Sequence, residues 1–219
     1  STIRINSNMA YTTIDDPEKY FKPLKYVGNL LQHPVEGFNH QPDWLWFKNA
    51  DTTNSHNLLD STRGTDKKIE GTNNNNAEAD TTTRLDSFDS DGFTVETDPS
   101  VNGNNNEIVV FSWAANGGSV TNVAESGDNP GFSRQTSTTA GFSIIKYTGT
   151  GAVGTIAHGL GIVPDFIIIK RLENADNWRT YDSVGGGTKA MRLNLNGAHG
   201  SSSSFYNDTD ATSSVFTVG

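Results

Sequence analysis

The feature that most constrains the fold is an internal repeat, in which the second half of the chain echoes the first. Four blocks recur in the same order, at an offset that stays between 121 and 123 residues: 20–28 at 141–149, 42–48 at 164–170, 60–67 at 182–189 and 93–95 at 216–218. This offset is far longer than the period of a solenoid, whose units pack only on their neighbours. The sequence therefore predicts two tandem domains, and such an array favours a structural or binding role over a single catalytic centre.

Composition points to an all-β protein. Glycine accounts for 22 of 219 residues, asparagine, serine and threonine are abundant, and only 19% of the residues are charged. These residue types suit short strands joined by polar turns. The hydrophobic content is low, at 33%, but the apolar residues gather in strand-like runs, which a disordered chain would not show.

Alternating and β-branched runs give the expected strands. In the first repeat these are 24–27, 44–48, 57–59, 84–88, 92–96 and 107–113. In the second repeat they are 142–147, 166–170, 179–182, 191–195 and 215–218. We expect antiparallel β-sandwiches, with an N-terminal strand and linker over 1–19, a first repeat over 20–118, a linker over 119–140 and an incomplete second repeat over 141–219.

The second repeat lacks a counterpart of the most apolar strand in the first. Segment 93–95 is followed by the strand 107–113, whereas its counterpart 216–218 is followed only by Gly219. A sandwich without that strand would expose unpaired backbone groups. We expect either a longer natural chain or a strand supplied by another subunit, and Ile3 and Ile5 in the alternating N-terminal stretch are the candidate donor residues.

Charge and cysteine content restrict the partners. The net charge of −9 disfavours nucleic acid and anionic membrane surfaces, because phosphate binding needs clustered lysine and arginine. No apolar run approaches the length of a membrane span. The chain has no cysteine, which excludes disulfides and thiolate chemistry, and this is typical of proteins assembled in a reducing cytoplasm and released later.

Several motifs resemble one family of proteins. They are Lys25-Tyr26-Val27-Gly28, the segment 37–44 with Pro42-Asp43-Trp44, the segment 59–64 with Asp60-Ser61, and 87–94 with Ser-Phe-Asp-Ser-Asp-Gly-Phe-Thr. Together they resemble repeats in large structural proteins of marine tailed phages (cyanophage-like), which are described as tail fibres or other virion appendages. The resemblance covers Tyr20 to the C-terminus, and the second copy departs from it by lacking the Ser-Phe-Asp-Ser-Asp-Gly segment.

The resemblance implies a fold and a role. The repeats of that family are similar to concanavalin-type lectins, so it implies jelly-roll or lectin-like sandwiches. It also implies a virion or extracellular location, partners among other copies and other virion proteins, and contact with host-surface glycans.

Two candidate ligand sites stand out. Asp86, Asp89 and Asp91 precede Gly92, and closely spaced carboxylates suit Ca²⁺, although the later acidic ligand of a calcium loop is missing. The alternative is a β-turn whose carboxylates accept hydrogen bonds from backbone amides. Trp178 lies in a polar loop and is the candidate for an exposed adhesive contact, whereas Trp44 and Trp46, two apart in a strand, fit a core.

The sequence does not favour an enzyme. It has no Gly-x-Ser-x-Gly elbow, no phosphate-binding loop and no histidine pair at metal-ligand spacing. We expect no cofactor beyond Ca²⁺. The expected function is a virion spacer or adhesin, and the alternative is a subunit of an extracellular bacterial filament or surface layer polymerised by strand exchange. A carbohydrate-cleaving enzyme is a third and less favoured hypothesis. Glycoside hydrolysis requires only two carboxylates at a set separation, which the sequence does not exclude.

Overall fold

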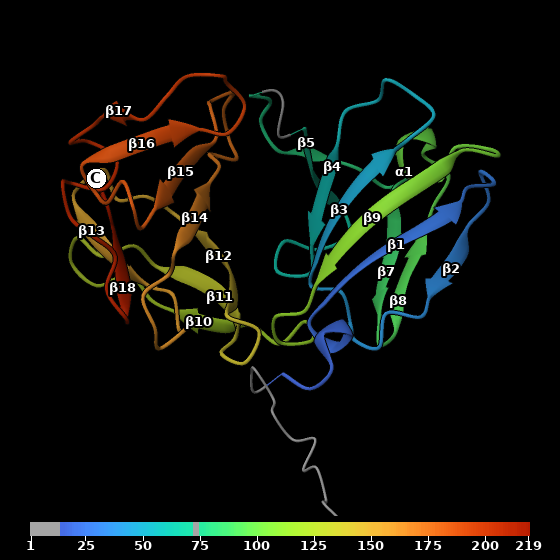
Figure 1. The fold of residues 1–219 in the computed structure, drawn as a ribbon, viewed down its shortest axis with the longest axis horizontal. Coiled ribbons are helices and arrows are strands. Elements are labelled where there is room, and N and C mark those ends of the chain that lie inside the picture. Colours follow the sequence, from blue (N-terminus) through green and yellow to red (C-terminus); the bar gives the residue numbers. More distant parts are fainter. Residues whose placement is uncertain (1–13, 72–74) are drawn as a thin grey trace, which may run out of the picture.

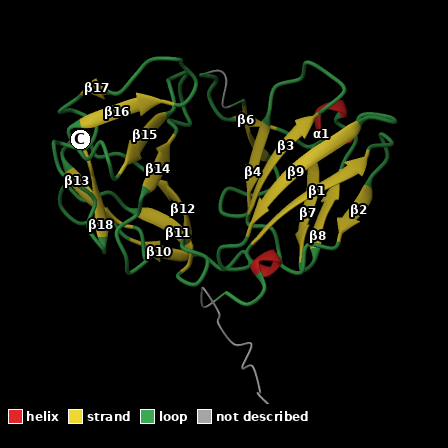
Figure 2. Ribbon diagram, viewed as in Figure 1, coloured by secondary structure: helices red, strands yellow, loops and turns green. Residues whose placement is uncertain are grey.

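The computed structural model describes residues 14–71 and 75–219, and these form an all-β protein with two lobes side by side (Figure 1). Every strand pair is antiparallel. Helix is confined, within the described residues, to a 3-10 turn at Pro17–Lys19 and to α1 at Pro99–Asn102 (Figure 2). None of the helices in these ranges is long and apolar enough to cross a membrane. The predicted all-β class is confirmed.

The first lobe contains two sheets. Its strands are β1 (Phe21–Val27), β2 (His33–Glu36), β3 (Trp44–Asn49), β4 (Asn57–Asp60), β5 (Lys67–Glu70), β6 (Ala79–Asp80), β7 (Leu85–Asp89), β8 (Gly92–Val95) and β9 (Glu107–Trp113). The larger sheet has the order β1-β9-β3-β4-β5-β6, and the smaller has the order β2-β8-β7. The expected strand 107–113 is therefore β9, and it lies inside the larger sheet between β1 and β3.

A hydrophobic core lies between these two sheets. It takes Leu45 and Phe47 from β3, Phe93 and Val95 from β8, and Val101 from α1, all of them fully buried. Side chains in a strand alternate between its two faces, so Leu45 and Phe47 point inward while Trp44 and Trp46 point to the opposite face of the sheet. These outward tryptophans are partly buried in the whole chain.

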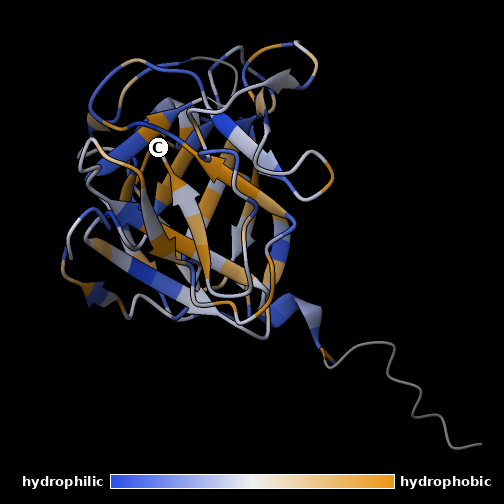
Figure 3. Ribbon diagram, turned by 90° about the vertical axis from the view of Figure 1, so that its left-hand side faces the viewer, coloured by the Kyte–Doolittle hydropathy of each residue, from blue (hydrophilic) through white to orange (hydrophobic). Residues whose placement is uncertain are grey.

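The second lobe contains smaller sheets. Its strands are β10 (Thr121–Val123), β11 (Phe132–Ser137), β12 (Phe142–Tyr147), β13 (Gly154–Ala157), β14 (Phe166–Ile169), β15 (Arg179–Asp182), β16 (Lys189–Arg192), β17 (Gly200–Ser201) and β18 (Val215–Val218). They form the sheets β10-β11-β12, β13-β18 and β14-β15-β16-β17. The apolar stretches of these strands gather toward the middle of the lobe (Figure 3), around Ile156, Tyr181, Tyr206 and Phe216.

The repeated sequence blocks pair in the same way in both lobes. Trp44 lies opposite Asp60 between β3 and β4, and Phe166 lies opposite Asp182 between β14 and β15. The ladder between β2 and β8 likewise has its counterpart in the ladder between β13 and β18. A one-residue shift in the pairing of two strands would turn every side chain to the wrong face. The matching registers therefore show that the repeated residues occupy equivalent positions in the two lobes.

The interval 119–140, which we predicted to be a linker, instead contributes strands. β11 pairs with β12 along its whole length, from Phe132 opposite Tyr147 to Ser137 opposite Phe142. In the first lobe β9 pairs with β1 in the matching register, from Ile108 opposite Tyr26 to Trp113 opposite Phe21. The strand that we expected to be missing from the second repeat therefore has a substitute, which comes from before the repeat and not from after it. The predicted donor residues Ile3 and Ile5 lie outside the described residues.

A buried histidine contributes a pH-dependent element to the first lobe. The His40 Nδ1 lies 2.7 Å from the carbonyl oxygen of Glu18, and Nε2 lies 2.7 Å from the Ser112 hydroxyl. Loss of hydration lowers the pKa of His40, although the Asp43 and Asp91 carboxylates act in the opposite direction. The ring is therefore held neutral, with Nδ1–H donating to the carbonyl.

We expect this histidine to make the fold less stable in mild acid. Because the pKa of His40 is lower in the folded chain than in the unfolded one, the unfolded chain binds the proton first, and the free energy of unfolding falls as pH drops below about 6.5. In His40→Gln this contribution is lost, so the decline should be shallower. Urea unfolding at a series of pH values measures it, with His33→Gln as the control that keeps the steeper decline. Equal slopes for His40→Gln and the wild type would show that His40 carries no such contribution.

A second test addresses the strand β11. Phe132 is 8% exposed and belongs to the core of the second lobe, whereas Val123 on β10 is 41% exposed. Phe132→Ala should lower the free energy of unfolding by about 3 kcal/mol through lost burial and the cavity it leaves. Val123→Ala should change it by about 0.5 kcal/mol or less. Denaturant unfolding measures both, and a Phe132→Ala cost as small as that of Val123→Ala would mean that this segment is a linker after all.

Candidate functional site

The two lobes meet through a cluster of apolar side chains of their own. From the first lobe it takes Trp44, Trp46, Leu58 and Ile69, and from the second Ile168, Leu172 and Trp178. We call this cluster the inter-lobe core. The first lobe's members come from β3, β4 and β5, and the second lobe's come from β14 and from the connection between β14 and β15. Figure 1 shows these parts of the two lobes facing each other.

Stacked aromatic rings extend the inter-lobe core. The Phe142 ring of β12 lies 5.6 Å from the Trp44 ring, at an interplanar angle of 9°. It also lies 6.0 Å from the Trp113 ring, at 24°. Trp44 itself packs against Trp46 and Trp113, with centroids 6.4 and 5.2 Å away. Each such pair contributes about 0.5–1.5 kcal/mol beyond its buried area, so Trp44 is the central residue of the contact.

A chain of hydrogen bonds crosses between the lobes beside these rings. Gln135 of β11 is fully buried, and its amide nitrogen donates to the hydroxyls of Ser61 and Thr62, each 2.8 Å away. The Ser61 hydroxyl in turn donates to the Asp43 carboxylate at 2.7 Å. Because Gln135 and Asp43 are fully buried, breaking one of these bonds would leave a buried polar group unsatisfied, which costs about 1–3 kcal/mol.

Asp43 anchors this chain of hydrogen bonds. Its carboxylate is buried and accepts four backbone N–H bonds, from Ala115, Asn116, Gly117 and Gly118, at 2.6–2.9 Å. A concave run of amides of this kind satisfies a carboxylate without a cation. The counterpart in the second lobe, Asp165, keeps the hydroxyl bond from its neighbour Ser183 but is exposed. Only the first lobe therefore has the full Asp43 arrangement.

A buried arginine stabilises the first lobe's side of the contact. The Arg63 guanidinium binds Asp60 and, at 2.9 Å, Glu78, and its side chain is 5% exposed. The backbone N–H of Glu78 donates to the Leu172 carbonyl of the second lobe at 2.7 Å. In the second lobe the residues corresponding to Arg63 and Glu78 are Gly185 and His199. There His199 binds the Asp182 carboxylate directly, at 2.6 Å. The hydrogen bond from the Gly185 amide, and after it the contact with His199, lower the pKa of Asp182.

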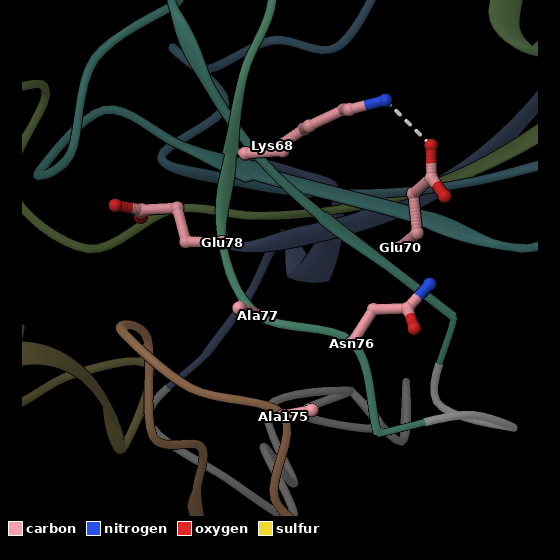
Figure 4. A pocket seen from close by; sticks show the side chains of 7 residues that line it. Lys68, Glu70, Asn76, Ala77, Glu78 and Ala175 are labelled. Carbon is pink, nitrogen blue, oxygen red and sulfur yellow. Dashed lines mark hydrogen bonds and ion pairs between the residues drawn. The ribbon is translucent and has the colours of Figure 1, made fainter.

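A cavity of about 330 Å³ opens at the edge of the contact. Figure 4 shows Lys68 and Glu70 of β5 on one wall, joined by an ion pair of 2.5 Å, with Ala175 of the second lobe on another. The Glu78 carboxylate extends away from the Lys68 ammonium, and Asn76 lies beyond Ala77, below Glu70 in this view. The Glu78 carboxylate thus lies apart from the Lys68–Glu70 ion pair.

The structure separates the three predicted metal-ligating carboxylates. The Asp91 carboxylate accepts hydrogen bonds from the amides of Asn39 and Gly37, at 2.6 and 3.2 Å, and Asp89 accepts one from the Thr94 hydroxyl. Among residues 14–71 and 75–219, no three acidic or histidine side chains come together as a metal ion requires. Asp86 is exposed and takes no part in these contacts. Asp91 thus acts as the alternative reading expects, by bracing a loop, and calcium binding stays a prediction.

The prediction for Trp178 was wrong. We expected an exposed adhesive contact, but its side chain is 3% exposed and lies in the inter-lobe core. Trp44 and Trp46 are packed, as we predicted, but against the other lobe and not inside their own. Sequence reasoning missed Gln135, Arg63 and the role of Ser61. The recurrence of Asp60-Ser61 as Asp182-Ser183 was the available signal for Ser61.

The inter-lobe core predicts that the lobes unfold together. Trp44→Ala should remove the central ring, lower the free energy of unfolding by about 3 kcal/mol and split one thermal transition into two. Phe111→Ala is the matched control, because Phe111 lies opposite Trp46 in the same sheet but is outside the inter-lobe core. Scanning calorimetry distinguishes the two variants. A single transition in Trp44→Ala at the wild-type temperature would contradict the role given to this ring.

One protein-family model matches most of the chain. Residues 16–219 match a family described as "Domain of unknown function (DUF7483)". The match begins at the 3-10 turn and runs through both lobes, so the family domain comprises the pair of lobes. Neither the curated proteins nor the solved structures gave a match. The chain belongs to the DUF7483 family.

Proposed function

We propose that this chain is a structural module of a phage virion, part of a tail fibre or other appendage, and that it serves as a spacer and host-surface adhesin. In this proposal the lobes are two β-sandwich repeats of jelly-roll or lectin-like type. The protein is not an enzyme, and its partners are other copies of itself, other virion proteins and host-surface glycans. It belongs outside the cell, on the virion.

The observation that carries the proposal is the inter-lobe core. A spacer has to hold its parts at a set distance, and lobes joined by a flexible linker would not do so. Here Trp44, Trp178 and Phe142 join the lobes by apolar and stacking contacts, and Gln135 adds buried hydrogen bonds. The family match over both lobes supports the same view, since the pair is the unit that recurs.

The chemistry of the contact also favours a structural role. Its polar groups bind one another: Asp43 is satisfied by amides and a hydroxyl, and Arg63 by two carboxylates. Asp43 and Arg63 therefore stabilise the folded chain, while the buried Gln135 Oε1 is the one atom of this hydrogen-bond chain that has no partner among the described residues. In this proposal, Asp43 and Arg63 serve to hold the contact between the lobes rigid.

One observation favours the alternative, a subunit of an extracellular bacterial filament. Within the described residues β14 pairs only with β15, whereas its counterpart β3 pairs with both β4 and β9. Phe166 on β14 is 50% exposed, and Ile162 just before it is 60% exposed. An open strand edge with apolar side chains is the feature that accepts a strand from a neighbour. Residues 1–8, with Ile3 and Ile5, are the donor in that reading.

Antibodies against the purified chain separate these functions. We expect them to label the appendages of virions in a lysate from cells that carry the gene, as seen by gold labelling in the electron microscope. Labelling of filaments on uninfected cells, lost on deletion of residues 1–8, would support the filament in place of the virion module. Antibodies that label neither particle nor filament would contradict both proposals.

A further inference from the structure

Two arginines face each other at the end of the second lobe's four-stranded sheet. Arg179 of β15 lies directly opposite Arg192 of β16, so the two side chains project from the same face. The residues at this place in the first lobe are Asn57 and Glu70. The first lobe thus has an amide and a carboxylate where the second has two guanidinium groups.

The two positions also differ in how their charge is balanced. Glu70 in the first lobe binds Lys68 at 2.5 Å and Arg84 at 2.8 Å. In the second lobe Arg179 has one carboxylate partner, Asp176, at 3.3 Å, and Arg192 forms no ion pair within the described residues. Two guanidinium groups with one carboxylate partner leave an excess of positive charge at this place. Like charges directly opposite on neighbouring strands are also destabilising.

Arg179 is held in position by its surroundings. Its guanidinium lies over the Phe205 ring, 4.0 Å from the centroid. Its Nη1 atom is buried and has no hydrogen-bond partner among the described residues, and the same is true of the neighbouring Tyr206 hydroxyl. An unpaired buried donor on a charged group destabilises the fold more than one on a neutral group. The Arg179 guanidinium, which lines the neighbouring cavity, is thus fixed in place with hydrogen-bonding capacity left over.

A cavity of about 400 Å³ opens beside the two arginines. Arg179, Ala190, Arg192 and Phe205 form part of its wall. Residues 195–198 and 200–202 form the rest, with an amide from Asn196 and hydroxyls from two serines as polar groups. A cavity of this volume is within the range of small-molecule sites, which start at about 300 Å³. It is lined by cationic donors, one aromatic ring, and hydroxyl and amide groups.

We propose that this cavity binds an acidic saccharide, with the sugar carboxylate between Arg179 and Arg192. A guanidinium donates two parallel N–H bonds that match the two oxygens of a carboxylate, and two guanidinium groups together offset its charge. The hydroxyl and amide groups of the 195–202 segment suit sugar hydroxyls, and the exposed part of the Phe205 ring suits the apolar face of a sugar. The net charge of −9 does not prevent this, since distant charges are screened over about 8–10 Å at physiological salt.

The inference rests on the adhesin role proposed above for its biological purpose, since it names the class of host-surface glycan. The binding itself is a property of the isolated chain. A failure of virion labelling would leave the binding result standing, and an empty cavity would leave a spacer module standing. The two proposals can therefore fail separately.

Titration calorimetry with trigalacturonate and its methyl ester tests the proposal. The ester keeps the sugar ring but lacks the carboxylate charge, so we expect it to bind at least about tenfold more weakly than the acid, because charge-assisted bonds are lost. Inorganic sulfate and phosphate form the third arm. Binding of these ions with equal or greater affinity would overturn the saccharide assignment, and so would equal binding of acid and ester or no saturation by about 10 mM trigalacturonate.

Variants locate the site. Arg192→Gln should weaken trigalacturonate binding by about tenfold, and Arg192→Lys should restore only part of it, because lysine keeps the charge but loses the two-pronged geometry. Arg171→Gln is the matched control: it removes the same charge from an exposed position of the same lobe, outside the cavity. Arg192 is exposed, so its replacement should not unfold the chain. Equal losses in Arg192→Gln and Arg171→Gln would mean that net charge, and not this cavity, governs binding.

Discussion

The packing of Trp44 against the second lobe is the interaction on which the rest of the arrangement depends. Strand β3 carries large apolar side chains on both faces: Leu45 and Phe47 on one, Trp44 and Trp46 on the other. One face is covered inside the first lobe, and the other is covered only when the second lobe lies against it. Phe142 and Trp178 supply that cover. Without it, adjoining aromatic rings would be exposed to water, which is a liability for a soluble chain.

The two lobes share a strand plan but balance their buried groups differently. The first lobe pairs Asp60 with Arg63, while the second, with glycine in place of Arg63, pairs Asp182 with His199. The first lobe balances Glu70 with two cations, while the second sets Arg179 against Arg192. The shared ladders thus define a scaffold, and the differences lie at its ends and edges, where a ligand or partner has access.

The repeat and the all-β class could be read from the sequence because they rest on local patterns. The positions of β3, β9 and β15 follow from alternation and β-branching, and the repeat relates the register of β3 on β4 to that of β14 on β15. Strand β11 could not be predicted from such local patterns. Its segment has one large apolar residue, Phe132, and becomes a strand because β12 offers it a ladder. Local propensity is a weak guide where tertiary pairing decides.

The error over Trp178 has a related cause. Its neighbours in the chain are polar, which is typical of an exposed loop, but the residue packs on the other lobe, which no local pattern reveals. The apolar character of both faces of β3 was the available hint, since a strand buried on both sides reads as a continuous apolar run. The Arg179–Arg192 pair also depends on register, because the two residues meet only through the pairing of β15 with β16.

The central claim is that the inter-lobe core joins two β lobes into one rigid body. Residual dipolar couplings of backbone amides in a weakly aligned sample test this most directly, because each rigid body reports its own alignment. We predict that a single alignment tensor fits the amides of both lobes, with the lobe orientations described above. Two different tensors, one for each lobe, would contradict the claim and show that the lobes move independently.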